Sequence, residues 1–309
     1  MSAKVSGGAV CLCCDSNFLP IALFLADQID RAVPDRDYDI CICSAEPLRL
    51  PDGFADRRFR VVQIDPDPEY LSFAVGSVSH ATYLRLWITD ALADDYSRIL
   101  YLDSDMFLEA GDPGELLGID LGGRPIGAVR DMQQWRKPDK LVSEFAALGL
   151  GPLPYFNAGL MLIDTALYQS EKITERALAL AQSNPGITHH LDQSLLNGVL
   201  RGGFAQISPV WNWQWVGSRP FLGNLVPLRI VHFVGHDKPW NDRKGTMPLR
   251  YRVQYERFLS RHFPDCPLWK PAMAPTTRKL AQMVYQSVRS YPALRRLIAQ
   301  FPDPLRTIQ

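Results

Sequence analysis

Short apolar runs alternate with stretches of helical periodicity along the first hundred residues. The runs predict β-strands, and the amphipathic stretches between them predict helices. The expected strands are 9–14, 38–43, 59–64 and 98–102, and the expected helices are 18–33 and 80–93. This alternation predicts an α/β fold with a parallel, doubly wound sheet and helices on both faces. Ligands bind beyond the carboxyl ends of the strands in such sheets, where Asp15 and Asp103 fall.

The alternation weakens in the middle of the chain, and the C-terminal part has a different character. Further strands are expected at 126–129, 159–163 and 226–234, helices at 171–183 and 193–200, and ordered loops at 201–225. Three prolines between 267 and 275 mark a linker. The segment 279–300 is expected to form one or two helices broken near Pro292. We therefore expect a main domain over 1–269 and a small helical appendage over 270–309.

The overall composition limits the partners of the protein. The chain has 309 residues, of which 47% are hydrophobic, so it can bury a sizeable core. Lys+Arg and Asp+Glu are equal at 33 each, and this balance gives no global field for a nucleic acid. No stretch reaches the roughly 18 uninterrupted apolar residues of a spanning helix, and no signal peptide is recognisable. A cytoplasmic protein is expected.

The last forty residues depart from this balance. They carry one acid, Asp303, against seven basic residues: Lys270, Arg278, Lys279, Arg289, Arg295, Arg296 and Arg306. Apolar residues are interleaved with the basic ones, which suits peripheral contact with an anionic membrane, at its inner face, where a lipid-linked acceptor would sit. The alternative is a helix that packs on the body or on a second subunit, with its arginines in solvent.

Four of the six cysteines form two pairs inside expected strands. Cys11 and Cys13, and likewise Cys41 and Cys43, are two residues apart and share one face of a strand. A zinc cluster is conceivable, but the spacing lacks the C-x-x-C form that structural zinc prefers. We interpret them as buried, reduced thiols that act as small hydrophobic groups.

Two carboxylates follow the strand expected over 98–102. Asp103 and Asp105 are two residues apart and point the same way if the strand continues. Converging carboxylate oxygens suit a hard divalent cation, which also offsets the repulsion between the acids. The alternative for such a pair is a helix cap or a solvated turn.

A second polar cluster, 232–240, follows an apolar run. His232 ends the run, Gly235 lets the backbone approach a ligand, and Lys238 supplies a positive charge. Imidazole together with carboxylates suits Mn(II), or another first-row ion, better than Mg(II) alone. The alternative is a core histidine beside a surface lysine.

Together the two clusters resemble the retaining glycosyltransferases of family 8, which include glycogenin and bacterial lipopolysaccharide galactosyl- and glucosyltransferases. The matching segments occur in the family's order and are 14–18, 81–85, 101–105, 155–159, 190–194 and 232–240. The Phe-Asn-Ala-Gly, Asp-Gln and His-x-x-Gly-x-x-Lys-Pro-Trp pieces are the most specific. The resemblance implies the GT-A fold, a Rossmann-like, mostly parallel sheet with flanking helices, and a UDP-sugar donor held through a divalent metal.

The resemblance also implies roles for single residues. The implied ligands of Mn(II), or of Mg(II), are Asp103, Asp105 and His232. Asp15 and Asn17 would contact uridine, with Phe18 stacking on uracil where many relatives have Tyr. The implied diphosphate residues are Arg85, Gly235 and Lys238, and Ser104 is included among the donor-binding residues. The residues implied around the donor sugar are Asp131, Asn157, Asp192 and Gln193.

We therefore expect metal-dependent transfer of glucose or galactose from a UDP-sugar to a saccharide acceptor, such as lipopolysaccharide, with retention of configuration. Retention through a covalent intermediate needs a carboxylate nucleophile. Gln193 stands where one is sought, so a same-face route is favoured. One alternative is a phosphotransferase of the haloacid-dehalogenase type, although Met106 follows the Asp-x-Asp where those enzymes have Thr or Val. The other is a non-catalytic sugar-binding protein on the same fold.

A row of tryptophans also has two interpretations. Trp211, Trp213 and Trp215 occupy alternating positions in the expected loop region. Their rings would provide a stacking platform for an acceptor sugar, or would fill the core.

Overall fold

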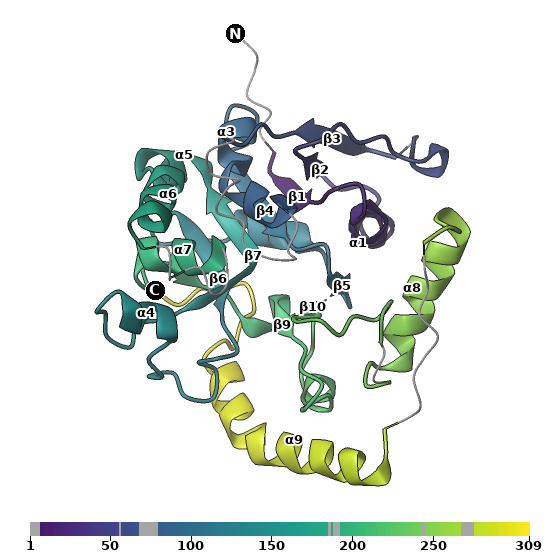
Figure 1. Ribbon diagram of the computed structural model, residues 1–309, viewed down its shortest axis with the longest axis vertical. Coiled ribbons are helices and arrows are strands. Elements are labelled where there is room, and N and C mark those ends of the chain that lie inside the picture. The colour runs from purple at the N-terminus through teal and green to yellow at the C-terminus, as the bar shows by residue number, and fades with distance from the viewer. Residues whose placement is uncertain are drawn as a thin grey trace.

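A mostly parallel sheet forms the centre of the computed structural model, which describes residues 7–55, 57–67, 80–184, 187, 192–242, 245–266 and 275–309 (Figure 1). Its seven strands have the order β3-β2-β1-β4-β7-β6-β8. Their bounds are β1 Ala9–Cys13, β2 Asp39–Ser44, β3 Phe59–Gln63, β4 Arg98–Leu102, β6 Ile126–Arg130, β7 Phe156–Asp164 and β8 Ala205–Gln206. Neighbouring strands pair in parallel except at β7, which is antiparallel to β4 and β6. The predicted fold class is therefore confirmed.

Helices cover both faces of this sheet. The α-helices are α1 Leu19–Ala32, α3 Ile88–Leu92, α4 Ser143–Ala147, α5 Thr165–Ser170, α6 Ile173–Ser183, α7 Asp192–Leu200, α8 Leu249–His262 and α9 Thr277–Ile298. One hydrophobic cluster joins α1 and α8 to one face of the strands, and a second joins α3, α5, α6 and α7 to the other face. Because β1, β2 and β4 are buried on both sides, the interior positions of each strand form a continuous apolar run.

A small second sheet lies beside the first (Figure 1). It has the order β5-β10-β9, with β5 at Met106–Leu108, β9 at Trp213–Gln214 and β10 at Ile230–His232. Since β4 belongs to the main sheet and β5 to the small one, the chain changes sheets within 103–105. This change of sheet places the Asp-x-Asp segment at their junction.

Several elements differ from the sequence prediction. The helix expected over 80–93 is a 3-10 helix, His80–Leu86, followed by the short α3. The strand expected over 226–234 is only the three residues of β10. The break expected near Pro292 is wrong, because α9 is one helix that contains this proline. Proline removes one backbone hydrogen bond and tends to kink a helix, and Figure 1 shows α9 changing direction along its length.

The C-terminal segment returns to the main sheet after α9. Gln206 in β8 and Ile308 exchange two backbone hydrogen bonds, of 2.8 and 3.0 Å. The Trp211 indole nitrogen donates to the carbonyl of Pro304 at 3.0 Å. Met283 and Leu294 of α9 are buried. Both α9 and the last residues thus contact the body of the protein. In the part of the chain that the structure describes, no helix is long and apolar enough to cross a membrane.

The cysteine pairs of β1 and β2 lie side by side. The register of the two strands sets Cys11 opposite Cys41 and Cys13 opposite Cys43. All four are buried and free. Among the described residues, no cysteine belongs to a group placed to hold a metal. The prediction that these four cysteines are buried thiols is confirmed.

Candidate active site

The segment between β4 and β5 carries the two aspartates and is anchored on both sides. The Ser104 hydroxyl donates to the carbonyl of Cys13, at the end of β1, at 3.2 Å. The Asp103 amide donates to the carbonyl of Gly159 in β7 at 2.7 Å. Ser104 itself is buried. These contacts fix the direction in which both carboxylates project.

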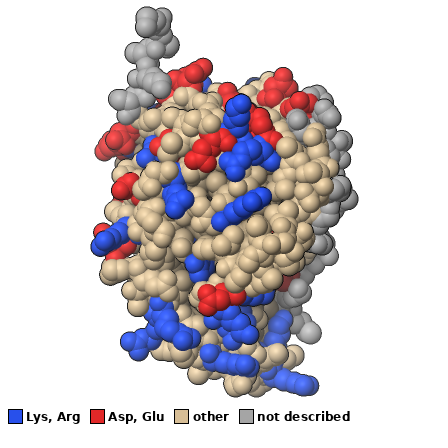
Figure 2. Space-filling model, turned by 90° about the vertical axis from the view of Figure 1, so that its left-hand side faces the viewer, with Lys and Arg blue, Asp and Glu red and all other residues tan. Residues whose placement is uncertain are grey.

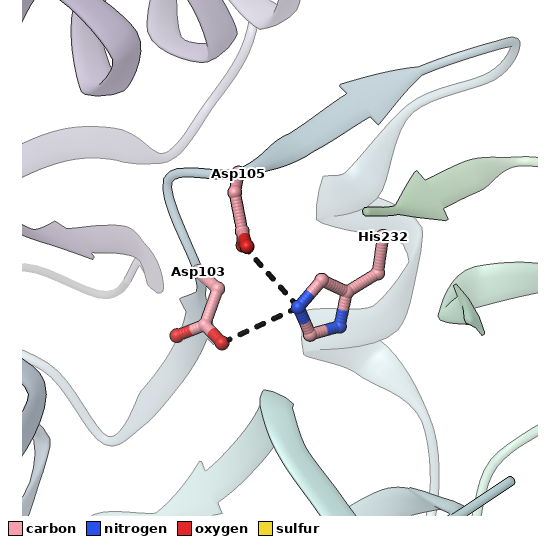
Figure 3. A group of neighbouring side chains, drawn as sticks. All are labelled: Asp103, Asp105 and His232. Carbon is pink, nitrogen blue, oxygen red and sulfur yellow. Dashed lines mark ion pairs between the residues drawn. The ribbon is translucent and has the colours of Figure 1, made fainter. Parts of the chain in front are cut away.

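His232 approaches the same point from the small sheet. The antiparallel pairing of β5 and β10 sets His232 opposite Met106, next to Asp105. The imidazole Nε2 lies 3.2 Å from Asp105 Oδ1 and 3.5 Å from Asp103 Oδ2, and Figure 3 shows both carboxylates directed at this one nitrogen. The structure thus brings together the three residues predicted as metal ligands, with one ligand atom of each within 4.8 Å of the others.

The spacing and chemistry of these groups fit a divalent ion. Adjacent ligand atoms of an octahedral ion with bonds of about 2.1 Å lie about 3 Å apart, close to the distances around His232. The imidazole Nδ1 is 3.0 Å from Asn212 Oδ1. An N–H donated from Nδ1 to this oxygen leaves the Nε2 lone pair facing the carboxylates. Two carboxylates and one imidazole suit Mn(II) or a similar ion.

The backbone of Gly159 lies directly against His232 and Asp103, and this close approach leaves no room for a side chain. A Cβ there would lie 2.3 Å from Cε1 of His232 and 2.8 Å from Oδ2 of Asp103. Both distances are far below normal van der Waals separations. The glycine of the Phe-Asn-Ala-Gly piece is therefore required for the convergence itself.

Lys238 lies beside the two aspartates, on the loop that follows β10. Its ammonium donates to Asp105 Oδ2 and, at 2.5 Å, to the carbonyl of Phe233. Burial tends to raise the pKa of Asp105, but Lys238 and His232 outweigh it and hold this pKa well below its usual range. Gly235 in the same loop has φ +85°, which only glycine adopts without strain.

Arg85 links the Asp-x-Asp segment to α7. Its Nη1 lies 3.0 Å from Asp103 Oδ1, and its Nε lies 2.7 Å from Asp192 Oδ2. Burial lowers the pKa of this guanidinium, but Asp103 and Asp192 outweigh burial and raise it above its usual range. The Tyr101 hydroxyl also donates to Asp103 Oδ1, at 2.5 Å. Arg85 is thus engaged by carboxylates of the protein.

The four residues predicted around the donor sugar come from β7, α7 and the turn after β6, and they lie close together. Gln193 Nε2 donates to Asp131 Oδ2 at 3.3 Å, and Asn157 Nδ2 donates to Gln193 Oε1 at 3.1 Å. Asp192 is buried as the first residue of α7. Burial raises the pKa of Asp192 to about 6, with Arg85 lowering it and Asp103 adding to the increase.

Asn212 belongs to the site, although the sequence analysis missed it. Its Nδ2 donates to Asn157 Oδ1 at 2.9 Å, while its Oδ1 faces His232. It therefore connects the candidate metal group with the candidate sugar group. A buried amide needs hydrogen-bond partners, but no sequence motif marks Asn212. Trp211 and Trp215 are buried in the core, so the core interpretation holds for these two.

The residues predicted to contact uridine form the turn after β1. Asp15 Oδ1 accepts a hydrogen bond of 2.8 Å from the Phe18 amide, and Asn17 and Phe18 are exposed. The Phe18 ring meets Trp240 edge-on, with ring centroids 6.4 Å apart. Two residues of the Asp-Gln piece, at 190 and 191, lie outside the described residues.

A two-sheet α/β fold with an Asp-x-Asp segment and a histidine at the sheet junction defines the GT-A class. The profile of glycosyl transferase family 8 matches residues 9–244, and the chain belongs to this family. Family membership gives no support to the haloacid-dehalogenase alternative.

Solved structures share the fold. An active-site mutant of LgtC has a TM-score of 0.68 and 20% identity, with the alignment covering 83% of this chain and 96% of LgtC. The galactosyltransferase LgtC in complex with donor and acceptor sugar analogs has a TM-score of 0.66 and 19% identity, with 89% and 99% covered.

Curated relatives are more similar in sequence. Glycosyltransferase GlyF of Streptococcus pneumoniae is 31% identical over 189 residues, which cover 59% of this chain and 43% of GlyF. The lipopolysaccharide 1,3-galactosyltransferase of Salmonella typhimurium is 27% identical over 237 residues, or 74% and 68% of the two chains. The lipopolysaccharide 1,2-glucosyltransferase of Escherichia coli is 32% identical over 173 residues, or 53% and 50%. The chain thus spans half or less of two of these relatives.

Proposed function

We propose that the protein is a metal-dependent, retaining hexosyltransferase that moves glucose or galactose from a UDP-sugar to a saccharide acceptor, such as a lipopolysaccharide. The observation that carries this proposal is the convergence of Asp103, Asp105 and His232 beside Lys238, in a chain of glycosyl transferase family 8. The names of the Salmonella and Escherichia coli relatives support a hexose as the transferred group and lipopolysaccharide as the acceptor class.

The departing diphosphate determines what the site must stabilise. Asp103, Asp105 and His232 would hold Mn(II) or Mg(II), which supplies positive charge to the diphosphate as its bond to the sugar breaks. Lys238 adds a second positive charge at the same place, after exchanging its pairing with Asp105 for a phosphate oxygen. Removal of one positive group of this kind costs about two to three orders of magnitude in rate.

Candidate residues are also available for the uridine and the diphosphate of the donor. We assign uridine to Asp15, Asn17 and Phe18, which follow β1 and include an exposed ring suited to stacking. The Gly235 backbone would approach the diphosphate. Arg85 is assigned a positioning role, because its guanidinium is engaged by Asp103 and Asp192. Ser104 likewise positions the aspartates by anchoring their segment to β1.

The donor sugar is assigned to the group of Asp131, Asn157, Asp192 and Gln193. Both ends of the Gln193 amide are hydrogen-bonded, and an amide is a poor nucleophile. We therefore propose a same-face displacement. The bond from the anomeric carbon to the diphosphate breaks, the acceptor oxygen bonds to that carbon on the same face, and its proton passes to the departing diphosphate. Asp192 stabilises the positive charge that develops on the ring. A glycosyl adduct trapped on Asp192 would overturn this route.

Release of UDP from a panel of UDP-sugars, with and without Mn(II), tests the proposal. The wild-type protein should release UDP only with the metal, and Asp105→Asn should lose about a hundredfold or more of the rate. The control is Asp52→Asn, because the Asp52 side chain is fully exposed on the surface. Equal UDP release after chelation, or full activity of Asp105→Asn, contradicts the proposal.

We also propose that α9 brings the protein to an anionic membrane, at the cytoplasmic side where UDP-sugars are available. Its exposed apolar side chains recur at helical spacing, and they are Leu280, Val284, Tyr285, Val288 and Tyr291. The adjacent face of α9 carries the buried residues that pack on the body. Figure 2 shows Lys and Arg gathered at the lower end of the molecule, where α9 lies in Figure 1. An apolar stripe flanked by arginines suits an anionic bilayer surface.

Flotation with anionic and neutral liposomes tests this second part. Wild type should float with anionic vesicles, and Val288→Asp should float less while still releasing UDP. Leu249→Asp in α8 is the matched control, since Leu249 is 65% exposed and Val288 is 67% exposed. The contrary outcome is a wild-type protein that does not float and self-associates, and that Val288→Asp makes monomeric. This result would assign the apolar stripe to contact with a second copy of the chain and would contradict the membrane proposal.

A further inference from the structure

A recess adjoins the candidate donor-sugar group. Its walls come from the end of β6, the loop after it, the segment 209–222 and Leu297 of α9. They border about 480 Å³ of empty space, part of which is open solvent. Trp135 and Trp213 contribute aromatic surface.

The recess shares a wall with the candidate active site. Asn212, which lines it, is also hydrogen-bonded to Asn157 and faces His232. Gln214, the next polar residue of the wall, accepts from the Met132 amide at 2.7 Å and donates to the Arg130 carbonyl at 3.1 Å. A molecule in the recess would therefore lie next to the bound donor sugar.

Two arginines in this wall, Arg130 and Arg219, form no ion pair with the described residues. Among the described residues, no hydrogen bond or ion pair engages the guanidinium of Arg130 or of Arg219, and the Nε of each is buried without an acceptor. Burial lowers the pKa of both side chains, an effect that Asp139 partly opposes at Arg130 and that Arg136 strengthens at Arg219. By contrast, the half-buried Arg57 is paired with Asp27.

An unpaired, partly desolvated guanidinium is costly, and a fixed counter-charge offsets that cost. Among the described residues, Asp139 offsets this cost in part at Arg130, and an anionic ligand in the recess would offset the rest. Guanidinium groups bind phosphate and carboxylate through paired N–H donors. The metal and Lys238 already provide for the donor diphosphate, so the anion belongs to the other substrate.

We propose that the recess binds an acidic acceptor saccharide, whose phosphate or carboxylate is held by Arg130 and Arg219 while Trp135 and Trp213 contact a sugar ring. The inference rests on the proposed function, because it assigns the chemical class of that enzyme's acceptor. An enzyme with this site would select its acceptor by negative charge as well as by contacts with sugar hydroxyl groups.

Binding of soluble probes in the absence of donor tests the proposal. The probes are glucose 6-phosphate, glucuronic acid and glucose, followed by calorimetry or by indole fluorescence. Wild type should bind at least one acidic probe roughly tenfold or more tighter than glucose. Arg130→Gln and Arg219→Gln should each remove most of this preference, and UDP with Mn(II) should not displace the acidic probe.

Arg124→Gln is the matched control, because Arg124 is exposed and precedes the strand that Arg130 ends. It should keep the preference. The melting temperature gives a separate readout, because loss of an unpaired, desolvated cation should not destabilise the fold. Equal affinities of all three probes in wild type overturn the inference, as does a preference that survives in the double variant. If the melting temperature falls in both variants while the preference for acidic probes persists, the two arginines stabilise the fold and do not bind the acceptor.

The UDP-release assay separates this inference from the proposed function. Metal-dependent UDP release without a preference for acidic probes refutes only the acidic acceptor. A preference for acidic probes without any UDP release refutes the transferase and leaves an anion site in the recess.

Discussion

Replacement of Gly159 by alanine tests the geometry of the metal group without removing a ligand. The added Cβ would lie 2.3 Å from Cε1 and 2.7 Å from Nδ1 of His232, and 2.8 Å from Oδ2 of Asp103. Normal carbon contacts are about 3.5–4.0 Å, so the imidazole has to move by more than about 1 Å. Asn212 and the pairing of β10 oppose that movement. Misplacement by about 1 Å costs on the order of a hundredfold in rate.

The assay is UDP release at saturating UDP-sugar, titrated with Mn(II). Gly159→Ala should lower the maximal rate about a hundredfold and raise the Mn(II) concentration for half-saturation. The matched control is Gly127→Ala in β6, whose Cβ would lie 2.5 Å from Leu121 Cδ2. Overpacking should cost both variants about 1–3 kcal/mol of unfolding free energy, while only Gly159→Ala should need more metal.

The comparison of the two variants decides the outcome. A Gly159→Ala protein with wild-type rate and wild-type metal requirement would refute the reasoning, since the three ligands then do not have to converge. An equal increase in metal requirement in Gly127→Ala would show that general destabilisation causes the effect.

Three further predictions concern single residues. The pKa of Asp192 is raised to about 6 in the folded protein. The protonated carboxyl therefore adds to the free energy of unfolding in full below the unfolded pKa of about 4, and this contribution is lost as the pH rises through 6. Metal-free Asp192→Asn should therefore gain up to about 3 kcal/mol relative to wild type between pH 4 and 7, and urea unfolding that gives a pH-independent difference would contradict this. Asn212→Leu should weaken metal binding about 10- to 100-fold, and an unchanged Mn(II) titration would argue against its role. Lys238→Gln should reduce kcat by about two to three orders of magnitude, whereas a change in KM alone would place the ammonium away from the diphosphate.

The sequence predicts strands best where burial is two-sided. β1 is apolar throughout and β2 and β4 are apolar except at their ends, and each was predicted within a residue or two of its bounds. The direction of β7 was not predictable, because an apolar run has no polarity along the chain. The helix α8 was missed although Tyr251, Tyr255 and Leu259 form a buried stripe. The four arginines of this helix interrupt the apolar pattern along the sequence.

Most candidate site residues carried a motif, but their contacts depend on tertiary structure. The meeting of His232 with Asp105 depends on the register of β5 and β10, which no local pattern encodes. The engagement of Arg85 by two carboxylates is equally non-local. Asn212 has no motif of its own, and its role is visible only once His232 and Asn157 flank it.

Crystals of the wild-type protein grown with UDP and Mn(II), measured at the manganese absorption edge, test the central claim most directly. The account predicts an anomalous peak about 2.0–2.3 Å from a carboxylate oxygen of Asp103, one of Asp105 and Nε2 of His232, with UDP phosphate oxygens completing the coordination. Bound UDP without an anomalous peak among these three residues, or a manganese ion held elsewhere, would contradict it.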